Sequence, residues 1–547
     1  MMASPIAYSI SISFLCCVSL FLLFCSSENG YALGGEERKT LQSHFHAVQV
    51  NSLLPASVCN SSTKDGGRKW WQVAGGGGER RWWKVVAGGG GGGRWWWKVV
   101  AGGGRWRQKM VVVESGGGRR WWVAAAEDNK RKGASLKVVH KYGPCSHLHE
   151  PIKENAPTVT EILRRDQSRV NSIQSRLRQN SLKESKATTI PVNSGNSIGT
   201  GNYIVRIGLG TPKKDFTLIF DTGSDFSWTQ CQPCLGSCYL QQEPVYDPSL
   251  SSTYTNITCS SQLCSQLSSA TSFPPRCFTN TCVYGIEYGD SSFSQGFFGS
   301  ETITLTPSDV FPNFLFGCGK NNYGLFGGAA GLIGLGRDPL SLVSQTSSKY
   351  GNYFSYCLPS TTSSSGYLTF GNGGGSSTGS SLQFTPLLSN SKVSSYFFDI
   401  IGIKVSGQTL SISQSVFKTA GSIIDSGTVI TRLPPAAYKR LRKAFRQQMK
   451  QYPLTQPLSI LNTCYDLSKY STVSIPKISF LFGGNIEVPL DKKGILYGGN
   501  VSQVCLAFAR NRAASESAIF GNVQQQTLDV VYDVAGGKLG FASGGCS

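Results

Sequence analysis

Two acidic residues lie in short motifs that recur within the 547-residue sequence. The stretch TLIFDTGSDFSW contains Asp221, and the stretch SIIDSGTVIT contains Asp425. In each motif an apolar run typical of a β-strand delivers one Asp, which a hydroxyl residue and Gly follow. Such a tripeptide alone is usually a turn, but an acid at the end of a buried strand is costly unless it is hydrogen-bonded or functional. Two copies in one chain therefore indicate a pair of carboxyl groups for general acid–base chemistry.

The elements around these motifs are predicted to be mostly strands. From Ala187 onward, β-branched stretches such as NYIVRIGLGTP alternate with Gly-rich turns. Each half also carries a later apolar element that contains Gly, GLIGLG at Gly331–Gly336 and AIFGN at Ala518–Asn522. The clearest helical pattern spans Pro434–Tyr452, and we assign its apolar stripe to the core. A mostly β body is therefore expected.

The region from about Asn202 to Cys546 resembles the pepsin-type aspartic proteases (family A1), and more narrowly their plant nepenthesin-like branch. The resemblance is carried by DTGSDFSWTQCQPC, YGDSSFSQG, FGCG, GLIGLG, IIDSGT and IFGNVQQQ. Upstream, SLKVVHKYGPC and ILRRDQSRV resemble the prosegment of plant aspartyl proteases similar to the chloroplast-nucleoid DNA-binding protease. The resemblance implies a mostly β, bilobal fold with the active-site cleft between two β lobes, at 188–385 and 386–547. A propeptide would occupy 33–187.

The same resemblance implies roles for individual residues. Asp221 and Asp425 would share one proton and activate the water that attacks a peptide carbonyl. Tyr288 and Gly289 would belong to a flap over the cleft, with Trp228 supporting the Tyr288 hydroxyl. No cofactor and no metal is expected. Support for the two acids would come from Thr222, Gly223, Ser224, Ser426, Gly427 and Thr428, with Ser224 and Thr428 bonding the outer carboxylate oxygens.

Cysteines are numerous, and 12 of the 17 follow the first motif. An even set in a secreted domain predicts about six disulfides, although their pairing cannot be deduced from sequence. Three of the cysteines could also mimic a zinc knuckle, but no matching His/Cys pair lies at standard spacing, so disulfides are favoured. The candidates are Cys231, Cys234, Cys238, Cys259, Cys264, Cys277, Cys282, Cys318, Cys357, Cys464, Cys505 and Cys546, the first three being the possible knuckle.

The N-terminus has the pattern of a secretory signal peptide at residues 1–32. Phe14–Phe24 is an apolar run followed by small residues, and it is too short to span a bilayer comfortably. An uncleaved anchor is the alternative. A secreted (apoplastic) or vacuolar protein without a transmembrane segment in its mature form is expected, with the chloroplast as the alternative. Asn256 and Asn500 are candidate N-glycosylation sites.

The formal net charge of +21 is unevenly distributed. From Ala187 onward there are 24 Lys+Arg and 18 Asp+Glu, so +15 of the total belongs to the N-terminal third. Residues at about 65–130 repeat Arg, Trp, Lys, Val and Gly. The codons GGT, GTG and TGG encode Gly, Val and Trp, which indicates a translated trinucleotide repeat that interrupts the propeptide, either a recent insertion or a mispredicted intron. Its Gly runs are expected to resist helix and strand. Stacking of its Trp side chains on single-stranded bases is the functional alternative.

A helix is predicted between this insertion and the first motif. Thr158 and Glu161 match a capping box, and apolar residues then recur at helical spacing from Leu163 to Leu177. One interpretation is a solvated basic helix, and the other is a propeptide helix that covers an acidic cleft. The basic residues of the segment are Arg164, Arg165, Arg169, Arg176 and Arg178.

Together these features predict an aspartic-type endopeptidase that hydrolyses proteins or peptides at acid pH. It would be made as a secretory zymogen, inhibited by its own propeptide until cleavage near Ala187. A monomer is expected, and a nucleic-acid partner is not. The alternatives are a non-catalytic inhibitor-like protein and a DNA-binding member of the same fold. Because both Asp motifs are complete, the enzyme is favoured over the inhibitor-like protein; because the apolar N-terminus points to the secretory route, it is also favoured over the DNA-binding member.

Overall fold

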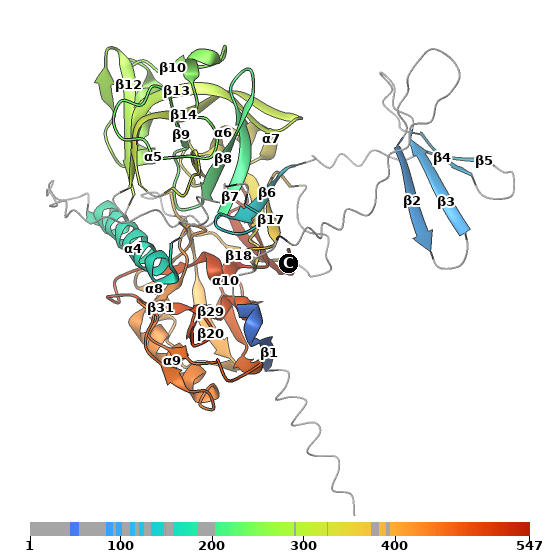
Figure 1. Cartoon of the computed structure of the whole chain (residues 1–547), viewed down its shortest axis with the longest axis vertical. Coiled ribbons are helices and arrows are strands. Elements are labelled where there is room, and N and C mark those ends of the chain that lie inside the picture. Colours follow the sequence, from blue (N-terminus) through green and yellow to red (C-terminus); the bar gives the residue numbers. More distant parts are fainter. Residues whose placement is uncertain are drawn as a thin grey trace, which may run out of the picture.

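The computed structural model describes residues 44–53, 59, 84–90, 94–100, 110–114, 120–124, 133–146, 148, 157–182, 203–288, 292–324, 326–372, 382–389 and 394–546. Figure 1 shows two β lobes, one in green and yellow and the other in orange and red, with helix α4 (Val159–Leu182) lying where they meet. The mostly β, bilobal fold expected from the sequence is confirmed. The predicted signal peptide and the predicted cleavage near Ala187 fall outside the described residues.

The largest sheet joins fifteen strands from distant parts of the chain. These strands are β6 (Ala134–His140), β7 (Tyr203–Leu209), β8 (Lys214–Asp221), β9 (Trp228–Gln230), β10 (Thr255–Asn256), β11 (Arg276–Phe278), β12 (Thr281–Glu287), β13 (Phe293–Thr306), β14 (Asp309–Tyr323), β15 (Gly331–Gly334), β16 (Tyr353–Cys357), β17 (Ser365–Phe370), β18 (Gln383–Pro386), β33 (Leu528–Asp533) and β34 (Lys538–Ser543). Their order is β11-β12-β13-β14-β9-β15-β8-β7-β6-β17-β16-β33-β34-β18, and β10 pairs with β13. Buried residues alternate with less buried ones along most of β13, as in a strand with one face on a core.

The second lobe is built from smaller sheets. Its strands are β19 (Tyr396–Phe398), β20 (Ile400–Val405), β21 (Gln408–Thr409), β22 (Ser422–Ile424), β23 (Thr431–Leu433), β24 (Leu454–Thr455), β25 (Cys464–Tyr465), β26 (Thr472–Pro476), β27 (Ile478–Phe482), β28 (Ile486–Pro489), β29 (Leu496–Asn500), β30 (Gln503–Leu506), β31 (Phe508–Arg510) and β32 (Ala518–Phe520). One sheet has the order β19-β22-β32-β23-β31, and two more have the orders β21-β20-β27-β28 and β24-β25-β30-β29. The predicted boundary between the lobes, at 385/386, falls within β18.

The same strand arrangement occurs once around each Asp. In the first lobe β15 runs parallel to β8 and antiparallel to β9, and β9 runs parallel to β14. In the second lobe β32 runs parallel to β22 and antiparallel to β23, and β23 runs parallel to β31. The two Gly-containing elements noticed in the sequence are therefore β15 and β32, each beside an Asp-bearing strand.

Several helices complete the fold. They are α5 (Gln262–Thr271), α6 (Leu342–Gln345), α7 (Ser347–Tyr350), α8 (Ser415–Lys418), α9 (Pro435–Gln448) and α10 (Asn522–Gln525), with the short 3-10 helices η1 (Val50–Leu53), η2 (Pro248–Leu250) and η3 (Lys492–Gly494). Helix α9 buries the predicted stripe but ends before Tyr452, because that residue precedes a proline and is disfavoured in helical geometry. Among the described helices, none is both long and apolar enough to cross a bilayer.

The region upstream of the first lobe contributes strands to both lobes. Strand β6 lies between β7 and β17 in the large sheet and buries four apolar side chains that face the cores, Ala134, Leu136, Val138 and Val139. Strand β1 (Phe45–Gln49) pairs antiparallel with β26 of the second lobe. The disulfide Cys59–Cys145 joins these two parts of the chain. The upstream region is thus built into the fold rather than laid over it.

The insertion forms a sheet of its own from β2 (Lys84–Gly90), β3 (Arg94–Val100), β4 (Met110–Glu114) and β5 (Arg120–Ala124). Its ladder joins no other described strand, and Figure 1 shows it apart from the two lobes. The expectation that its Gly runs resist strand formation was wrong for Gly88, Gly89 and Gly90, which pair with residues of β3. A strand ladder uses only backbone N–H and C=O groups, which Gly also has.

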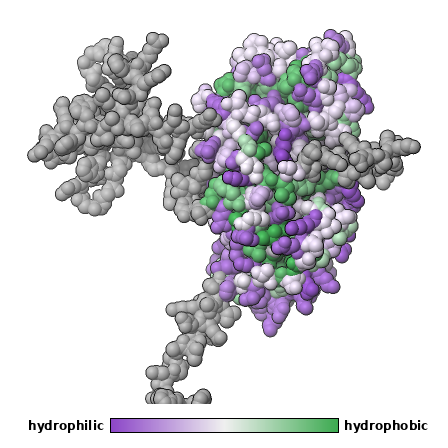
Figure 2. Space-filling view, turned by 180° about the vertical axis from the view of Figure 1, so that it is seen from behind, coloured by the Kyte–Doolittle hydropathy of each residue, from purple (hydrophilic) through white to green (hydrophobic). Residues whose placement is uncertain are grey.

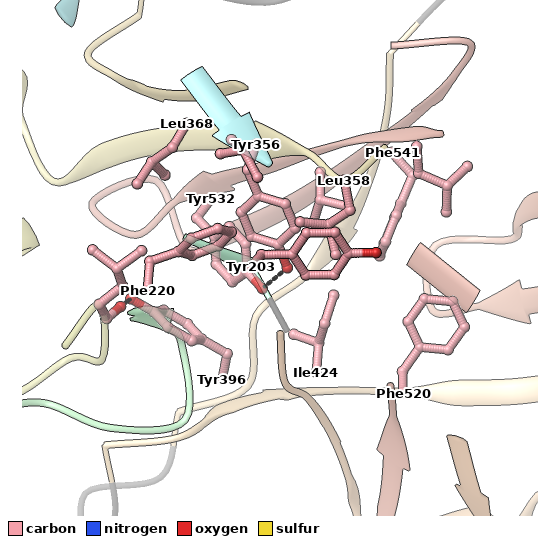
Figure 3. Close-up of a cluster of buried hydrophobic side chains, with 14 of the residues drawn as sticks. Tyr203, Phe220, Tyr356, Leu358, Leu368, Tyr396, Ile424, Phe520, Tyr532 and Phe541 are labelled. Carbon is pink, nitrogen blue, oxygen red and sulfur yellow. Dashed lines mark hydrogen bonds between the residues drawn. The ribbon is translucent and has the colours of Figure 1, made fainter. Parts of the chain in front are cut away.

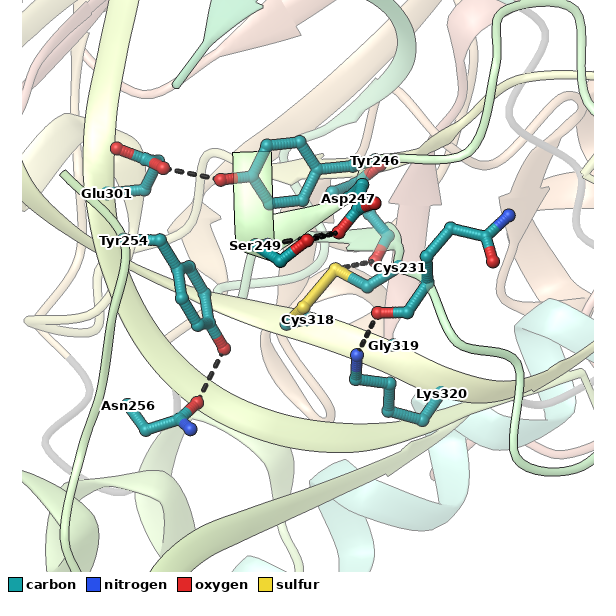
Figure 4. Close-up of a disulfide and its surroundings, with 12 residues drawn as sticks. Cys231, Tyr246, Asp247, Ser249, Tyr254, Asn256, Glu301, Cys318, Gly319 and Lys320 are labelled. Carbon is teal, nitrogen blue, oxygen red and sulfur yellow. Dashed lines mark hydrogen bonds between the residues drawn. A yellow bond between two sulfur atoms is a disulfide. The ribbon is translucent and has the colours of Figure 1, made fainter. Parts of the chain in front are cut away.

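All twelve cysteines of the predicted set are paired, so Cys231, Cys234 and Cys238 are not ligands of a zinc knuckle. Figure 4 shows the disulfide that joins Cys231, at the end of β9, to Cys318 in β14. Tyr239, in the loop that follows, packs on Phe326, which also packs on Trp228. The six pairs are Cys231–Cys318, Cys234–Cys238, Cys259–Cys277, Cys264–Cys282, Cys357–Cys546 and Cys464–Cys505.

One cluster of buried side chains extends through both lobes. It includes Phe220 and Ile424, the residues immediately before the two Asp residues, and Figure 3 shows both against Tyr356, Tyr396 and Tyr532. The hydroxyls of Tyr356 and Tyr532 lie 3.0 Å apart. These aromatic side chains support the ends of the two Asp-bearing strands, β8 and β22. On the outer face seen in Figure 2, hydrophobic residues instead form patches that polar residues interrupt.

Candidate active site

Asp221 and Asp425 meet at the centre of the molecule because their strands end at equivalent points of the two lobes. Asp221 is the last residue of β8, and its C=O accepts a hydrogen bond from the N–H of Leu335 (2.9 Å). Asp425 directly follows β22, and its N–H donates to the C=O of Phe520 (3.2 Å). Both side chains are buried. The pair predicted from the repeated motif is therefore brought together.

The loops that carry the two acids hold each other through the residues that follow them. The N–H of Thr222 donates to Oγ of Ser426 (3.1 Å), and the N–H of Ser426 donates to Oγ1 of Thr222 (2.9 Å). The two hydroxyls lie 3.3 Å apart. Because each loop is bound by the other lobe, the spacing of the two carboxylates depends on both lobes together.

Backbone N–H groups of two glycines bind the carboxylates. Gly223 donates to Oδ1 of Asp221 (2.9 Å), and Gly427 donates to Oδ1 of Asp425 (3.0 Å). A Cβ on Gly223 would lie 2.6 Å from Oδ1 of Asp425, and one on Gly427 would lie 2.6 Å from Oδ1 of Asp221. Any larger residue at either position would therefore collide with the opposite carboxylate and with Arg169.

The hydroxyls expected to bond the outer oxygens differ between the lobes. Thr428 donates its hydroxyl to Oδ2 of Asp425, as the resemblance implied. The matching bond from Ser224 was predicted wrongly: Ser224 Oγ and Asp221 Oδ2 are both buried without a hydrogen-bond partner among the described residues. In this state Asp221 receives its contacts from Gly223 and Arg169 on Oδ1 alone.

Tyr288 lies at the end of β12, where the turn to β13 begins. Its hydroxyl accepts a hydrogen bond from Nε1 of Trp228 (2.7 Å), the contact that the resemblance implied. Its ring lies edge-on to Phe326, with 6.1 Å between ring centroids. Gly289, the second predicted flap residue, lies outside the described residues.

Helix α4 places Arg169 between the two carboxylates. Nη2 of Arg169 lies 2.7 Å from Oδ1 of Asp221 and 2.9 Å from Oδ1 of Asp425, and its Nε donates to Oδ2 of Asp425 (3.0 Å). Of the two interpretations of this basic segment, the helix that covers an acidic cleft agrees with these contacts. Thr158 caps the helix by accepting from the N–H of Glu161, whose side chain pairs with Arg164 and Arg165 instead of completing the capping box.

Two further polar residues of α4 bind the second lobe. Asp166 accepts hydrogen bonds from the N–H groups of Val429 (2.6 Å) and Ile430 (3.1 Å) and forms an ion pair with Arg432 (2.8 Å). Gln174 makes two hydrogen bonds with the backbone of Ser517, through Nε2 to its C=O (2.8 Å) and through Oε1 from its N–H (2.9 Å). On the same helix, Leu163, Val170 and Ile173 are buried against the second lobe.

The charge of Arg169 sets the protonation of its partner. Burial would raise the pKa of the Asp425 carboxyl, but the Arg169 guanidinium, with hydrogen bonds from Thr428 and Gly427, holds that pKa below its usual range. A third carboxyl, Asp225, accepts hydrogen bonds from the Asp338 N–H and the Ser394 hydroxyl. Burial raises the pKa of Asp225 to about 6 in spite of these bonds.

Sequence reasoning missed several residues of the site. Arg169 was only one of five arginines on a predicted helix, and Asp166, Gln174 and Arg432 were not singled out. The signal that could have found Asp166 and Arg169 is their spacing of three residues, which places both on one helical face. Within the described residues, no group of three or more His, Cys, Asp or Glu side chains is placed to hold a metal ion.

Comparison with known proteins finds two matching families, described as "Xylanase inhibitor N-terminal" for residues 203–372 and "Xylanase inhibitor C-terminal" for residues 395–543. An aspartyl protease family protein of Arabidopsis thaliana is 55% identical over 419 residues, which are 76% of this chain and 88% of the relative. Aspartic proteinase nepenthesin-2 of Nepenthes gracilis is 37% identical over 71% of this chain and 86% of its own length. Among solved structures, the basic 7S globulin from soybean has a similar fold, with a TM-score of 0.50 and 22% identity over 63% of this chain and 91% of that chain.

Proposed function

The chain belongs to the pepsin-like family of aspartic proteases, and on this premise we propose that it is an aspartic endopeptidase of the plant secretory pathway, made as an inactive zymogen. The observation that carries the proposal is the pair Asp221 and Asp425. One nitrogen of Arg169 contacts an oxygen of each, at 2.7 and 2.9 Å. A site that fits one nitrogen between two carboxylates also fits one water once that nitrogen leaves.

The chemistry follows from the closeness of the two acids. Two like charges so near each other cannot both ionise readily, so the pair keeps one proton. The ionised carboxylate takes a proton from the water, whose oxygen attacks the carbonyl carbon of the peptide bond. The protonated carboxyl donates a hydrogen bond to the carbonyl oxygen, and a proton is then delivered to the leaving nitrogen. No covalent enzyme intermediate forms, and the N–H groups of Gly223 and Gly427 hold the carboxylates throughout.

The position of α4 between the two lobes supports the zymogen proposal. Arg169 fills the place of the water, and the helix blocks the approach of a substrate to the cleft. Its hold is specific, since Asp166 and Gln174 bond to backbone groups of the second lobe on either side of Arg169. The expected partners of the active enzyme are proteins or peptides, and the expected intramolecular inhibitor is this helix.

Acid release is expected to depend on Asp425. Because its pKa is depressed while Arg169 is docked, the ion pair stabilises docking above the pKa of the free carboxyl and loses that effect as pH falls through the depressed value. Asp166 does not add to this effect: burial raises its pKa, whereas the charge of Arg432 and the N–H groups of Val429 and Ile430 favour its ionised form. The dyad contact is therefore the part of the docking surface that acid weakens.

The oxidising environment of the secretory pathway fits the disulfides. Asn256 and Asn500 are both exposed, as glycosylation requires. Figure 4 includes Asn256, whose Oδ1 accepts a hydrogen bond from the Tyr254 hydroxyl (2.6 Å). The apoplast or vacuole is the proposed destination of a monomeric enzyme.

A non-catalytic, inhibitor-like role is the second candidate, and the descriptions of the two matching families favour it. Such a protein needs no acid pair. The complete set of hydrogen bonds around Asp425, and the presence of a helix that plugs the pair, favour the enzyme.

The proposal is tested by the hydrolysis of denatured haemoglobin after acid treatment, assayed from pH 3 to pH 7. We expect acid activity in the wild-type protein, its suppression by pepstatin, and its loss by a factor of about 10³ or more in Asp221→Asn, because an amide cannot share the proton.

The matched control is Asp215→Asn, which changes a carboxyl on the same strand that pairs with Lys213 outside the cleft. It should leave activity unchanged. If the folded, processed wild-type protein hydrolyses nothing, or if Asp221→Asn retains activity, the protease proposal is wrong and the inhibitor-like role becomes the better explanation.

A further inference from the structure

The Asp166 carboxylate occupies a small, fully enclosed site on the second lobe. Its two oxygens receive three contacts, from the N–H of Val429 (2.6 Å), the N–H of Ile430 (3.1 Å) and Nη2 of Arg432 (2.8 Å). All four residues are buried. The two N–H groups belong to the end of the second Asp motif, and Arg432 lies in β23, which follows it directly.

Arg432 is held in place independently of the helix. Its Nη1 donates to the C=O of Ile430 (2.7 Å), which orients the guanidinium within its own strand. Its Nε is buried with no hydrogen-bond acceptor in the part of the chain that the structure describes. Asp166 is also the single carboxylate that forms an ion pair with it among those residues. The described residues of the two lobes therefore supply no counter-charge to this guanidinium.

Removal of α4 would take Asp166 out of this site, whereas Val429, Ile430 and Arg432 belong to the second lobe and would remain. Two backbone N–H groups and the Arg432 guanidinium would then lose the acceptor that they contact in the docked state. An anion of the same geometry as Asp166 is what restores those contacts.

The position of the site indicates which part of a bound substrate could reach it. Val429 and Ile430 follow Thr428, and Asp166 lies three residues from Arg169, so the two side chains are neighbours on one face of α4. An extended substrate advances about 3.3 Å per residue. A side chain that reached this site would therefore belong to a residue within about two or three positions of the scissile bond.

We propose that, after α4 leaves, the N–H groups of Val429 and Ile430 and the guanidinium of Arg432 form a subsite for the carboxylate of a Glu or Asp side chain of the protein substrate. The helix would then inhibit partly by presenting a substrate-like acid. This inference rests on the proposed protease function, and it adds a class of preferred substrate, acidic peptides.

The test uses blocked peptides that share one scissile bond and carry a single Glu or its neutral counterpart Gln at each nearby position in turn. Acid-processed wild-type protein is assayed at about pH 5, where a free Glu is ionised. At one position the Glu peptide should show a kcat/KM about 10-fold or more above that of the Gln peptide. In Arg432→Gln this ratio should fall to about 1.

Two further variants separate a local effect from a general one. Arg432→Lys keeps the charge and should keep part of the preference, even if Arg432→Gln fails to fold. Arg510→Gln removes an exposed guanidinium from the neighbouring strand β31 and should leave the Glu/Gln ratio unchanged. A thermal melt of each variant reports whether it is folded.

A failure of the subsite proposal can be told apart from a failure of the protease proposal. If the wild-type protein cleaves the peptides but treats Glu and Gln alike at every position, the subsite is wrong and the protease proposal stands. If it cleaves none of them, the protease proposal fails, and binding of fluorescently labelled peptides decides the subsite. Tighter binding of a Glu peptide would then support it, and equal binding would overturn it.

Discussion

At the scale of residues, the charge balance of the site depends on one guanidinium group, that of Arg169. Arg169 contacts both acids, and without it two carboxylates would lie buried beside each other. Removing one partner of a buried ion pair typically costs about 3–5 kcal/mol, because the remaining charge is left uncompensated. The same residue thus blocks the site and holds the helix there.

Replacement of this residue gives a first prediction at the residue scale. Arg169→Gln should weaken docking of α4, so that processing of the zymogen proceeds at a higher pH than in the wild-type protein. The pH at which half the protein is processed in a fixed time, followed on gels, measures the effect. Arg164→Gln, which removes a half-exposed arginine paired with Glu161, should leave that pH unchanged. A variant Arg169→Gln with the wild-type profile would show that the dyad contact does not set acid release.

At the scale of elements, the segment upstream of the first lobe acts through two pieces, helix α4 in the cleft and strand β6 in the large sheet. The last residue of β6 is His140, whose ring lies against Tyr203 of β7. Burial, with the nearby charge of Lys141, lowers the pKa of His140 to about 4. A histidine that is neutral when packed and cationic when free is a source of acid sensitivity.

The packed state of His140 should lose stability in acid. Because the packed form of His140 has the lower pKa, the unpacked form binds the extra proton between its ordinary pKa of about 6.5 and about 4, and the packed state loses stability as pH falls through that window. We expect His140→Gln to lose this part of the pH dependence. Urea unfolding of the zymogen at pH 7 and pH 4 measures it, with His44→Gln as the control. An unchanged difference between the two pH values would contradict the assignment.

At the scale of the whole molecule, the two lobes and the upstream region form one interlocked unit, whereas the insertion does not belong to it. Strand β6 is paired on both sides, and β1 is paired with the second lobe. The disulfide Cys59–Cys145 spans 86 residues and joins the chain on either side of the insertion. The sheet β2–β5 shares no ladder with the other described strands.

Deletion of residues 65–130 should therefore leave the fold and the site intact. We expect the melting temperature to change by less than about 3 °C and the acid activity per mole to stay the same, since no described contact of the dyad or of α4 comes from this segment. Thermal melting and the haemoglobin assay check this. Loss of folding in the deletion variant would show that the insertion stabilises the protein.

The sequence by itself determined the chemistry and the class of fold. Asp221, Asp425 and the glycines after them were predictable because a repeated motif at the end of an apolar strand reflects local constraints, which a single segment records. The β content and helix α9 followed from periodicity for the same reason. The disulfide partners and the exchange of hydrogen bonds between Thr222 and Ser426 were not predictable, because each depends on atoms brought together from distant segments.

Only the tertiary structure decided that Arg169, rather than one of its four neighbouring arginines, enters the dyad, and that Asp166 finds Arg432. In the sequence alone, nothing distinguishes the five arginines of this helix from one another. They become different when Leu163, Val170 and Ile173 fix the rotation of the helix against the second lobe and thereby choose which polar side chains face the carboxylates.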